Sequence, residues 1–376
     1  QKTLNQCRSY NICFHHLLLL NIKQSLREGN SLLQECNRAH EWFRGMNRRQ
    51  RIVMAVIIGG SLIYIILTQT LLVFSSPPGE PTEPEFRKTC SSVLQKISKN
   101  KVVEEDKSLP VIYVVTPTYR RPEMVAELTR LGQTLTMVPR VHWIVAEDSN
   151  TCTASVQNIL ERLGLPYTHI ASPMPEVYRK ERYVPRGVSN RRASLEWVRE
   201  YGEDTGILYF LDDDNAIDIR LFEEMRTTKK VSMWPVGLIG EYTVSSPVVK
   251  DGKVVAFYDG WPAGRKFQVD MAGFAVNMGF LKSQAAKQEK VQAAKQDKKH
   301  PKVTMPYIAG HEEDGFLKSL NMGISDIEVK AEGCTQILVW HTQTIWNPSH
   351  ALWLDKHQTD NIKKLTDNMR HLGMIK

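Results

Sequence analysis

Three adjacent carboxylates, Asp212, Asp213 and Asp214, follow directly after the strongly apolar run 206–211 (GILYFL). Neighbouring carboxylates repel one another, so such a cluster needs groups that offset its charge. Mg²⁺ and Mn²⁺ prefer oxygen ligands and commonly bind one or two carboxylates together with phosphate oxygens. The triplet therefore predicts a site for a divalent cation and a nucleotide. The alternative is a solvated acidic turn that caps the next helix.

A second candidate is the segment 185–192 (PRGVSNRR), in which a glycine opens a predicted helix and Arg186 and Arg191 lie five positions apart. Guanidinium groups pair bidentately with phosphate oxygens, and the N-terminus of a helix favours anions. The segment predicts a contact to a diphosphate. Its alternative is a solvated helix face, because most arginines are exposed.

A third candidate is the segment 310–314 (GHEED). Acidic side chains are favoured in the first turn of a helix by the helix dipole, which is a sufficient structural explanation. One of these carboxylates could also remove a proton from a substrate hydroxyl. His341, in the run 339–342 (VWHT), leaves the same choice between a buried structural residue and a ligand.

The elements that must position these residues alternate in type. Apolar runs predict strands at 111–115, 141–146 and 206–211, and amphipathic spacing predicts helices at 123–135 and 187–200. Strands alternating with helices predict an α/β fold with a mostly parallel central sheet and helices on both faces.

Ligands of such sheets bind beyond the carboxyl ends of the strands. The polar residues that follow the predicted strands are Thr118, Tyr119, Asp148 and the three aspartates. We therefore expect these side chains to meet at one edge of the sheet.

The C-terminal half has a different texture. Short runs at 254–258 and 337–339 are separated by Gly, Pro and Trp, which predicts a mixed, partly antiparallel half. The near-repeat 284–290 (QAAKQEK) and 292–298 (QAAKQDK) predicts an exposed helix or a loop insertion.

The uncharged apolar run 52–74 predicts a transmembrane helix. Its 23 residues, at about 1.5 Å each, are long enough to cross the roughly 30 Å hydrocarbon core. The leader 1–51 has nine Lys and Arg residues against three acidic ones. Because positive charge stays on the cytoplasmic side, we expect a type II protein with its C-terminal part across the membrane.

Beyond the anchor we expect a stem at 75–108, with a short helix near 92–97, and a folded domain at 109–376. The domain divides into two halves, 109–214 and 215–376. Most of the net charge of +8 lies in the leader. The domain therefore lacks the excess of basic residues expected of a nucleic-acid-binding protein.

Three cysteines, Cys90, Cys152 and Cys334, lie beyond the predicted anchor. The sequence has no C-x-x-C pair, which argues against a zinc knuckle or a dithiol redox site. Cys90 falls in the predicted stem, where an interchain disulfide and an unpaired thiol are both open.

Eight segments, in order, resemble the β-1,3-glucuronyltransferases, which add glucuronic acid to a terminal galactose. They are distributed over about 109–344 and are 113–119 (YVVTPTY), 140–148 (RVHWIVAED), 185–191 (PRGVSNR), 209–215 (YFLDDDN), 221–226 (LFEEMR), 234–240 (WPVGLIG), 270–276 (DMAGFAV) and 337–342 (ILVWHT). The resemblance makes 109–376 a catalytic domain, with a donor half, 109–214, and an acceptor half, 215–376. The resemblance implies a nucleotide-sugar transferase fold of the GT-A type, UDP-glucuronate as donor and Mn²⁺ as cofactor. It also implies a Golgi membrane location with the catalytic domain in the lumen, and a homodimer.

For the nucleotide end of the donor, the resemblance implies that Tyr119 borders the uracil and that Asp148 holds its imide edge. It implies that Arg186 and Arg191 contact the phosphate or the sugar of the donor.

For the reacting end of the donor, the resemblance implies that Asp212 and Asp213 hold the ribose and the donor sugar. It makes Asp214 the direct metal ligand and brings His341 to the diphosphate.

On the acceptor side, the resemblance implies that Trp261 stacks on a galactose ring, with Arg265 and Asp270 bonded to its hydroxyl groups. Glu313 falls at the position of the catalytic base, and Glu312 does not. The implied reaction is a single inverting displacement that joins glucuronic acid to the 3-hydroxyl of galactose in the proteoglycan linker tetrasaccharide.

The chain departs from the family pattern at three positions. Ser245 stands where the family has an acceptor-contacting Glu, and Ala309 and Gln343 stand where it has basic residues. Two alternatives therefore stay open: transfer to N-acetyllactosamine on glycoproteins or glycolipids, and a carbohydrate-binding relative without catalysis.

Overall fold

The computed structural model describes residues 87–98, 101–102, 105–295, 303–345 and 360–374, together with Asn47 and Arg49. The chain divides into two units, 1–78 and 79–376, and the second is described here. The predicted anchor, 52–74, lies outside the described residues. Among the residues that are described, no helix has both the length and the apolar character needed to span a membrane.

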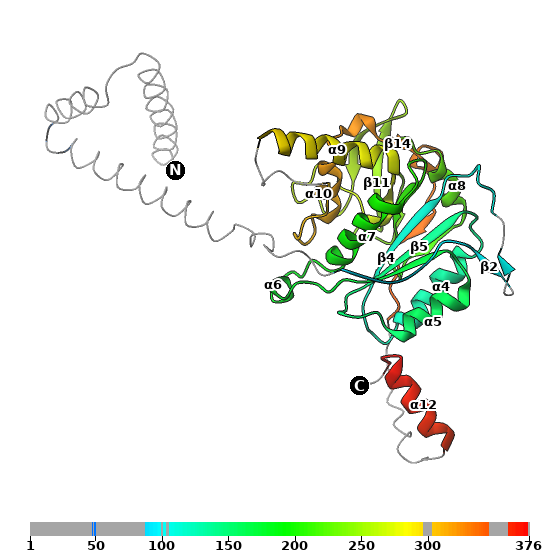
Figure 1. The fold of residues 1–376 in the computed structure, drawn as a ribbon. Helices are drawn as coiled ribbons and strands as arrows, with labels where there is room; N and C mark the ends of the chain where they lie inside the picture. Colours follow the sequence, from blue (N-terminus) through cyan, green and yellow to red (C-terminus); the bar gives the residue numbers. More distant parts are fainter. Residues whose placement is uncertain are drawn as a thin grey trace. The chain divides into compact units, whose positions relative to one another are not determined.

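The larger sheet has eight strands in the order β1-β6-β5-β4-β7-β13-β9-β14. Its central strands β4 and β5 lie side by side in Figure 1. In chain order the strands are β1 (Lys88–Val93), β4 (Ile112–Thr118), β5 (Val141–Glu147), β6 (Tyr167–Ala171), β7 (Ile207–Phe210), β9 (Val231–Met233), β13 (Phe274–Asn277) and β14 (Glu328–Val329).

The parallel part of this sheet is its centre. Strands β6, β5, β4 and β7 are parallel neighbours, whereas β1 pairs antiparallel with β6 and β13 runs antiparallel between β7 and β9. The expectation of a mostly parallel sheet is thus right for 112–210 and wrong at both flanks. The outer strands come from the stem side and from the C-terminal half, outside the strand–helix alternation on which the expectation depended.

Both faces of the parallel strands are covered by helices. The strand residues alternate between two buried clusters, with Ile112 and Val114 on the side of α4 (Met124–Leu135) and α5 (Ala154–Leu163), and Tyr113 and Val115 on the side of α7 (Val188–Tyr201). This alternation is the two-residue period of a strand. The helices predicted at 123–135 and 187–200 are confirmed as α4 and α7 (Figure 1).

A second sheet of five strands, in the order β12-β11-β10-β15-β8, lies in the C-terminal half. Its strands are β8 (Ala216–Ile217), β10 (Val236–Gly237), β11 (Val244–Lys250), β12 (Lys253–Tyr258) and β15 (Val339–Trp340). Asp251 and Gly252 join β11 to β12 with positive φ angles of 51° and 72°, the conformation that two-residue hairpin turns favour.

The remaining described elements are shorter or peripheral. They are β2 (Ile97–Ser98), β3 (Lys101–Val102), α6 (Glu176–Arg179), α8 (Arg220–Arg226), η1 (Met271–Gly273), α9 (Met278–Lys295), α10 (Glu312–Ser319), η2 (Ile324–Asp326), α11 (Ala331–Cys334) and α12 (Asp360–His371). The near-repeat begins within α9, so its first copy is helical, and the end of its second copy lies outside the described residues.

The end of the predicted stem is part of the larger sheet. The helix expected near 92–97 is wrong, because Lys88–Val93 forms the edge strand β1 and pairs with β6. Cys90 on β1 forms an intrachain disulfide with Cys152, 62 residues later. The interchain and unpaired alternatives for Cys90 are therefore both wrong, and Cys334 is a free thiol.

Candidate active site

A cavity of about 540 Å³ opens beyond the carboxyl ends of β4, β5 and β7. Seven of the predicted donor and metal residues line it, and they are Tyr119, Asp148, Arg186, Arg191, Asp212, Asp213 and Asp214. The expected convergence of side chains at this edge is therefore confirmed. His341 is not among the lining residues, whereas Gln343, one of the departures from the family pattern, is.

Asp213 is the most enclosed member of the aspartate triplet, with a side chain 6% exposed. Its Oδ2 accepts hydrogen bonds from Thr118 Oγ1 at 2.7 Å and Arg121 Nη1 at 2.9 Å, and its Oδ1 accepts from Arg121 Nη2 at 2.6 Å. Arg121 also pairs with the buried Glu127. Asp213 therefore ties β4 to the loop after β7 and shapes the cavity floor.

Asp212 pairs with Arg191 in the first turn of α7. The turn before the helix requires a glycine, because Gly187 has a φ of +73° and a Cβ there would lie 2.6 Å from Arg191 Nη1. The Nε of Arg191 is buried and has no hydrogen-bond partner among the residues that the structure describes. This arginine thus keeps an unused donor beside the cavity, as an anion-binding residue would.

Asp214 differs from its two neighbours. Its backbone carbonyl accepts hydrogen bonds from Arg130 Nη2 at 2.6 Å and from Thr342 Oγ1. Within the part of the chain that the structure describes, its carboxylate accepts none. Burial, together with repulsion from Asp212 and Asp213, raises the pKa of Asp214 to about 6. A divalent cation would relieve this repulsion, so the oxygen donors present fit a metal of the Mg²⁺ or Mn²⁺ class.

Asp148 lies on the opposite wall and is held from two sides. Its Oδ1 accepts from the backbone N of Met174 at 2.7 Å and from Arg179 Nη2 at 2.5 Å. Tyr119 is 42% exposed, with Arg121 4.8 Å and Arg186 5.9 Å from its ring centroid. An exposed aromatic face beside an anchored carboxylate can accommodate a planar base.

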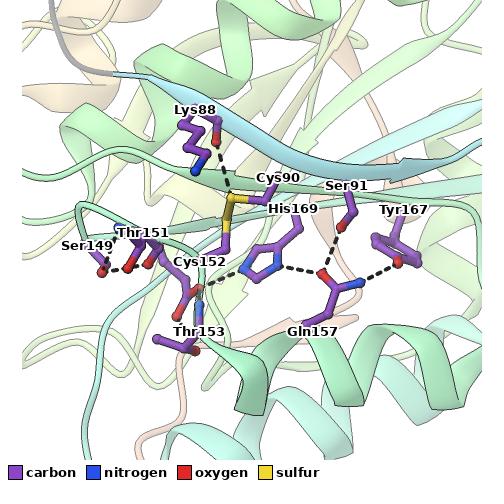
Figure 2. The surroundings of a disulfide bond; sticks show 11 residues. Lys88, Cys90, Ser91, Ser149, Thr151, Cys152, Thr153, Gln157, Tyr167 and His169 are labelled. Atoms are coloured by element: carbon purple, nitrogen blue, oxygen red, sulfur yellow. Dashed lines mark hydrogen bonds and ion pairs between the residues drawn. A yellow bond between two sulfur atoms is a disulfide. The ribbon is translucent and has the colours of Figure 1, made fainter.

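The loop that carries Asp148 is fixed by the disulfide region (Figure 2). Cys152 in this loop is bonded to Cys90 on β1. Thr153 donates from its backbone N to Glu147 Oε2 at 2.7 Å, and His169 Nε2 lies 2.7 Å from the same oxygen. The loop is therefore tied both to the edge strand and to the buried end of β5.

Glu147, Cys152 and His169 are close enough together to suggest a metal site. The sulfur of Cys152 is already part of the disulfide, and both ring nitrogens of His169 are bonded, Nδ1 to Gln157 and Nε2 to Glu147. This cluster is therefore a structural network, and the aspartate triplet is the better cation site.

The predicted acceptor residues form a second group around Glu313 in the first turn of α10. The Glu313 side chain is 16% exposed, and its Oε2 lies 3.9 Å from Arg265 Nη1. Burial, then repulsion from Glu312 and Asp270, raises the pKa of Glu313 to about 8. A carboxyl group with such a pKa is matched to proton transfer near neutral pH.

The other members of this group surround Glu313. Asp270 caps η1 by accepting from the backbone N of Ala272 at 3.0 Å, and His341 Nδ1 lies 3.7 Å from Asp270 Oδ2. Trp261 is 60% exposed. A Cβ on Gly310 would lie 3.1 Å from the Trp261 indole nitrogen, so the indole packs on the turn that leads to Glu313.

Arg191 connects the two groups. Its positive charge acts on Asp212 in the cavity and also on Glu313 and Glu312 in the acceptor group. Asp270 likewise lies within electrostatic range of Asp212. The base candidate and the aspartate triplet are therefore electrostatically coupled through Arg191, which lines the cavity.

Sequence reasoning missed several residues that hold this site. Arg121 is the second residue after the TPTY segment, and its place beyond a strand end could have identified it. Arg179 lies on the short helix α6 and Arg130 on α4, and no pattern in the sequence marks either of them as a partner of Asp148 or Asp214.

The fold and the site together define a class: an α/β domain whose parallel strands end at an acidic, arginine-lined cavity suited to a metal-bound nucleotide. The particular family follows from comparison. The model of glycosyltransferase family 43 matches residues 131–345, and the chain belongs to this family.

Named relatives and a solved structure show the extent of the similarity. The chain is 48% identical over 269 residues to galactosylgalactosylxylosylprotein 3-beta-glucuronosyltransferase S of Drosophila melanogaster, covering 71% of this chain and 62% of that protein. It is 42% identical over 249 residues to galactosylgalactosylxylosylprotein 3-beta-glucuronosyltransferase 2 of Mus musculus, covering 64% of this chain and 71% of that protein. S. aureus TarS 1–349 in complex with UDP-GlcNAc aligns with a TM-score of 0.39 at 13% identity, over 63% of this chain and 60% of that one. The chain thus spans less than two thirds of the Drosophila relative.

Proposed function

We propose that this protein is a β-1,3-glucuronosyltransferase that transfers glucuronic acid from UDP-glucuronate to the 3-hydroxyl of a terminal galactose. The observation that carries the proposal is the cavity lined by the aspartate triplet and by Arg191, which pairs with Asp212 and whose charge also acts on Glu313 in the acceptor group. The names of the relatives support galactosylgalactosylxylosyl chains, the start of the proteoglycan linker, as the acceptor.

The residues of the cavity supply the donor site in this proposal. Tyr119 and Asp148 receive the uracil, while Arg186 and Arg191, which also line the cavity, contact the diphosphate and the sugar. Arg186 is suited to this role because, among the described residues, no acidic side chain pairs with it. Asp214, assisted by Asp213, would hold Mn²⁺, which when bound offsets the charge of the departing diphosphate.

Glu313 performs the proton transfer. Its carboxylate takes the proton from the galactose 3-hydroxyl as that oxygen attacks the anomeric carbon of the donor. One displacement inverts the α-linked donor to a β-linked product, so no covalent intermediate with the protein is needed. Trp261, Arg265 and Asp270 orient the acceptor, and His341 is assigned to the diphosphate side.

The test is a transfer assay on the purified full chain with UDP-glucuronate, Mn²⁺ and a panel of galactosides. We expect transfer to galactosyl-β1,3-galactose, with galactosyl-N-acetylglucosamine as the competing acceptor. Transfer to the second acceptor alone would reassign the substrate. If UDP-glucuronate binds but no galactoside is modified, the catalytic proposal fails in favour of a carbohydrate-binding protein.

We further propose a Golgi membrane location, with the run 52–74 as the anchor, and a homodimer. The apolar run and the basic leader support the anchor. Alkaline extraction of cell membranes tests it, because an anchored chain stays with the lipid. Sedimentation of the detergent-solubilised chain tests the dimer.

A further inference from the structure

A buried carboxylate at the acceptor end of the site has no role in the proposal above. Asp259 follows β12 directly, and its side chain is 3% exposed. The hairpin of β11 and β12 brings it beside Ser245, because their neighbours Ser246 and Tyr258 are paired across the strands. Asp259 Oδ2 accepts a hydrogen bond from Ser245 Oγ at 2.5 Å.

The other oxygen of Asp259 binds the acceptor loop. Oδ1 accepts from the backbone N of Trp261 at 2.7 Å and from Arg265 Nη2 at 2.9 Å. Asp259 thus contacts two residues of the predicted acceptor set, one through its backbone and one through its side chain. A single carboxylate fixes the indole-bearing turn and the guanidinium relative to each other.

Arg265 uses nearly all of its donors within this loop. A guanidinium has five N–H groups. Nε donates to the carbonyl of Trp261 at 2.9 Å, Nη2 donates to the same carbonyl at 2.5 Å and to Asp259, and Nη1 donates to the carbonyl of Val269 at 3.3 Å. One N–H of Nη1 remains, on the atom that lies 3.9 Å from Glu313 Oε2.

The charges around Glu313 make the orientation of Arg265 important. Glu313 faces the carboxylates of Glu312 and Asp270 and the guanidinium of Arg191, in addition to Arg265. Asp259 draws Arg265 toward the hairpin. Among the described residues, Asp259 and Glu313 are the acidic side chains within 4 Å of this guanidinium. Loss of the Asp259 carboxylate would therefore leave Glu313, the group that must accept a proton, as the remaining acidic partner.

We propose that Asp259, supported by the hydroxyl of Ser245, is a positioning residue that holds Arg265 beside the β11–β12 hairpin and away from full pairing with Glu313. The inference depends on the proposed function, since it concerns the same acceptor site. It assigns to Asp259 a part in acceptor affinity and in the pH range of turnover, with no part in donor binding.

The test uses the full chain and the variants Asp259→Asn and Ser245→Ala. For Asp259→Asn we expect the KM for the galactoside to rise and kcat to fall, each roughly tenfold, which corresponds to the loss of one charged hydrogen bond. The acid limb of the kcat profile should move to lower pH, because Arg265 then stabilises ionised Glu313. Ser245→Ala should show the same changes to a smaller extent, and UDP affinity should be unchanged in both.

A second variant, which moves the carboxylate to a neighbouring position, distinguishes the loss of the charge from misfolding of Asp259→Asn. The double variant S245D/D259S places the carboxylate on the opposite strand of the same pair and should recover most of the acceptor affinity. Asp218→Asn is the control, because among the described residues its carboxylate pairs with the exposed Arg220 alone, outside the site, and its kinetics should match the wild type.

Two results would overturn the inference: a folded Asp259→Asn protein with the wild-type KM and pH profile, or a folded double variant without recovery. A wild-type chain that transfers to no galactoside would instead refute the proposed function, so the two failures are distinguishable.

Discussion

The pH dependence of transfer gives the sharpest test of the base assigned to Glu313. Only the ionised carboxylate can accept a proton, and burial with its acidic neighbours raises the pKa of Glu313 to about 8. Activity should therefore rise with pH. With this pKa, about 3% of Glu313 is ionised at pH 6.5 and about 76% at pH 8.5, so kcat/KM should rise roughly 25-fold between them.

The assay measures initial rates at limiting concentrations of both substrates, so that the profile reports the free enzyme. Glu312→Gln is a matched variant on the same helical turn. It removes the largest like charge acting on Glu313, so the profile should move to lower pH while activity is retained. Glu313→Gln should lose turnover by about two to four orders of magnitude and keep its UDP affinity. A flat wild-type profile, or a Glu313→Gln variant with normal turnover, would refute the assignment.

Three further predictions concern the donor cavity and its supports. Replacing Cys90 and Cys152 together by Ser should lower the free energy of unfolding by about 4 kcal/mol, the chain-entropy value for a loop of this length. Urea denaturation with and without reductant measures the change, and an unchanged midpoint would contradict the prediction. Gly187→Ala should weaken UDP binding roughly tenfold in calorimetric titration, because its Cβ displaces Arg191 and costs about one charged hydrogen bond; wild-type affinity would show that Arg191 does not bind the donor. Asp214→Asn should reduce UDP affinity in Mn²⁺ to the level that the wild type shows in EDTA, and a persistent metal effect would move the metal to another ligand.

The donor edge of the fold was predictable because its signals are local. Each parallel strand is an apolar run that ends in polar residues, and parallel strands bring their carboxyl ends to one edge. That rule alone places Asp148 and Asp214 in one cavity. The TPTY and DDDN segments, at the ends of β4 and β7, are therefore sufficient to predict the position of the cavity.

The remaining features depend on partners that are distant in the sequence. The pairing of Cys90 with Cys152 spans 62 residues, and nothing in the spacing of three cysteines selects it. Strand β13 enters the sheet beside β7 from the C-terminal half, which no alternation of strands and helices predicts. In the sequence, nothing distinguishes Asp259 from an ordinary turn residue. Its hydrogen bond with Ser245 depends on the β11–β12 hairpin, which brings the two residues together.

The disulfide between β1 and the loop after β5 also bears on how the folded domain would be released from the proposed anchor. A proteolytic cut in the segment 94–110 would sever the backbone, yet the piece that carries Cys90 would stay attached through Cys152 and through its pairing with β6. Shedding into the medium would therefore require cleavage on the N-terminal side of β1. A cut on the C-terminal side of β1 would release the domain only after reduction of the disulfide. Gels run with and without reductant would separate these two kinds of cleavage product.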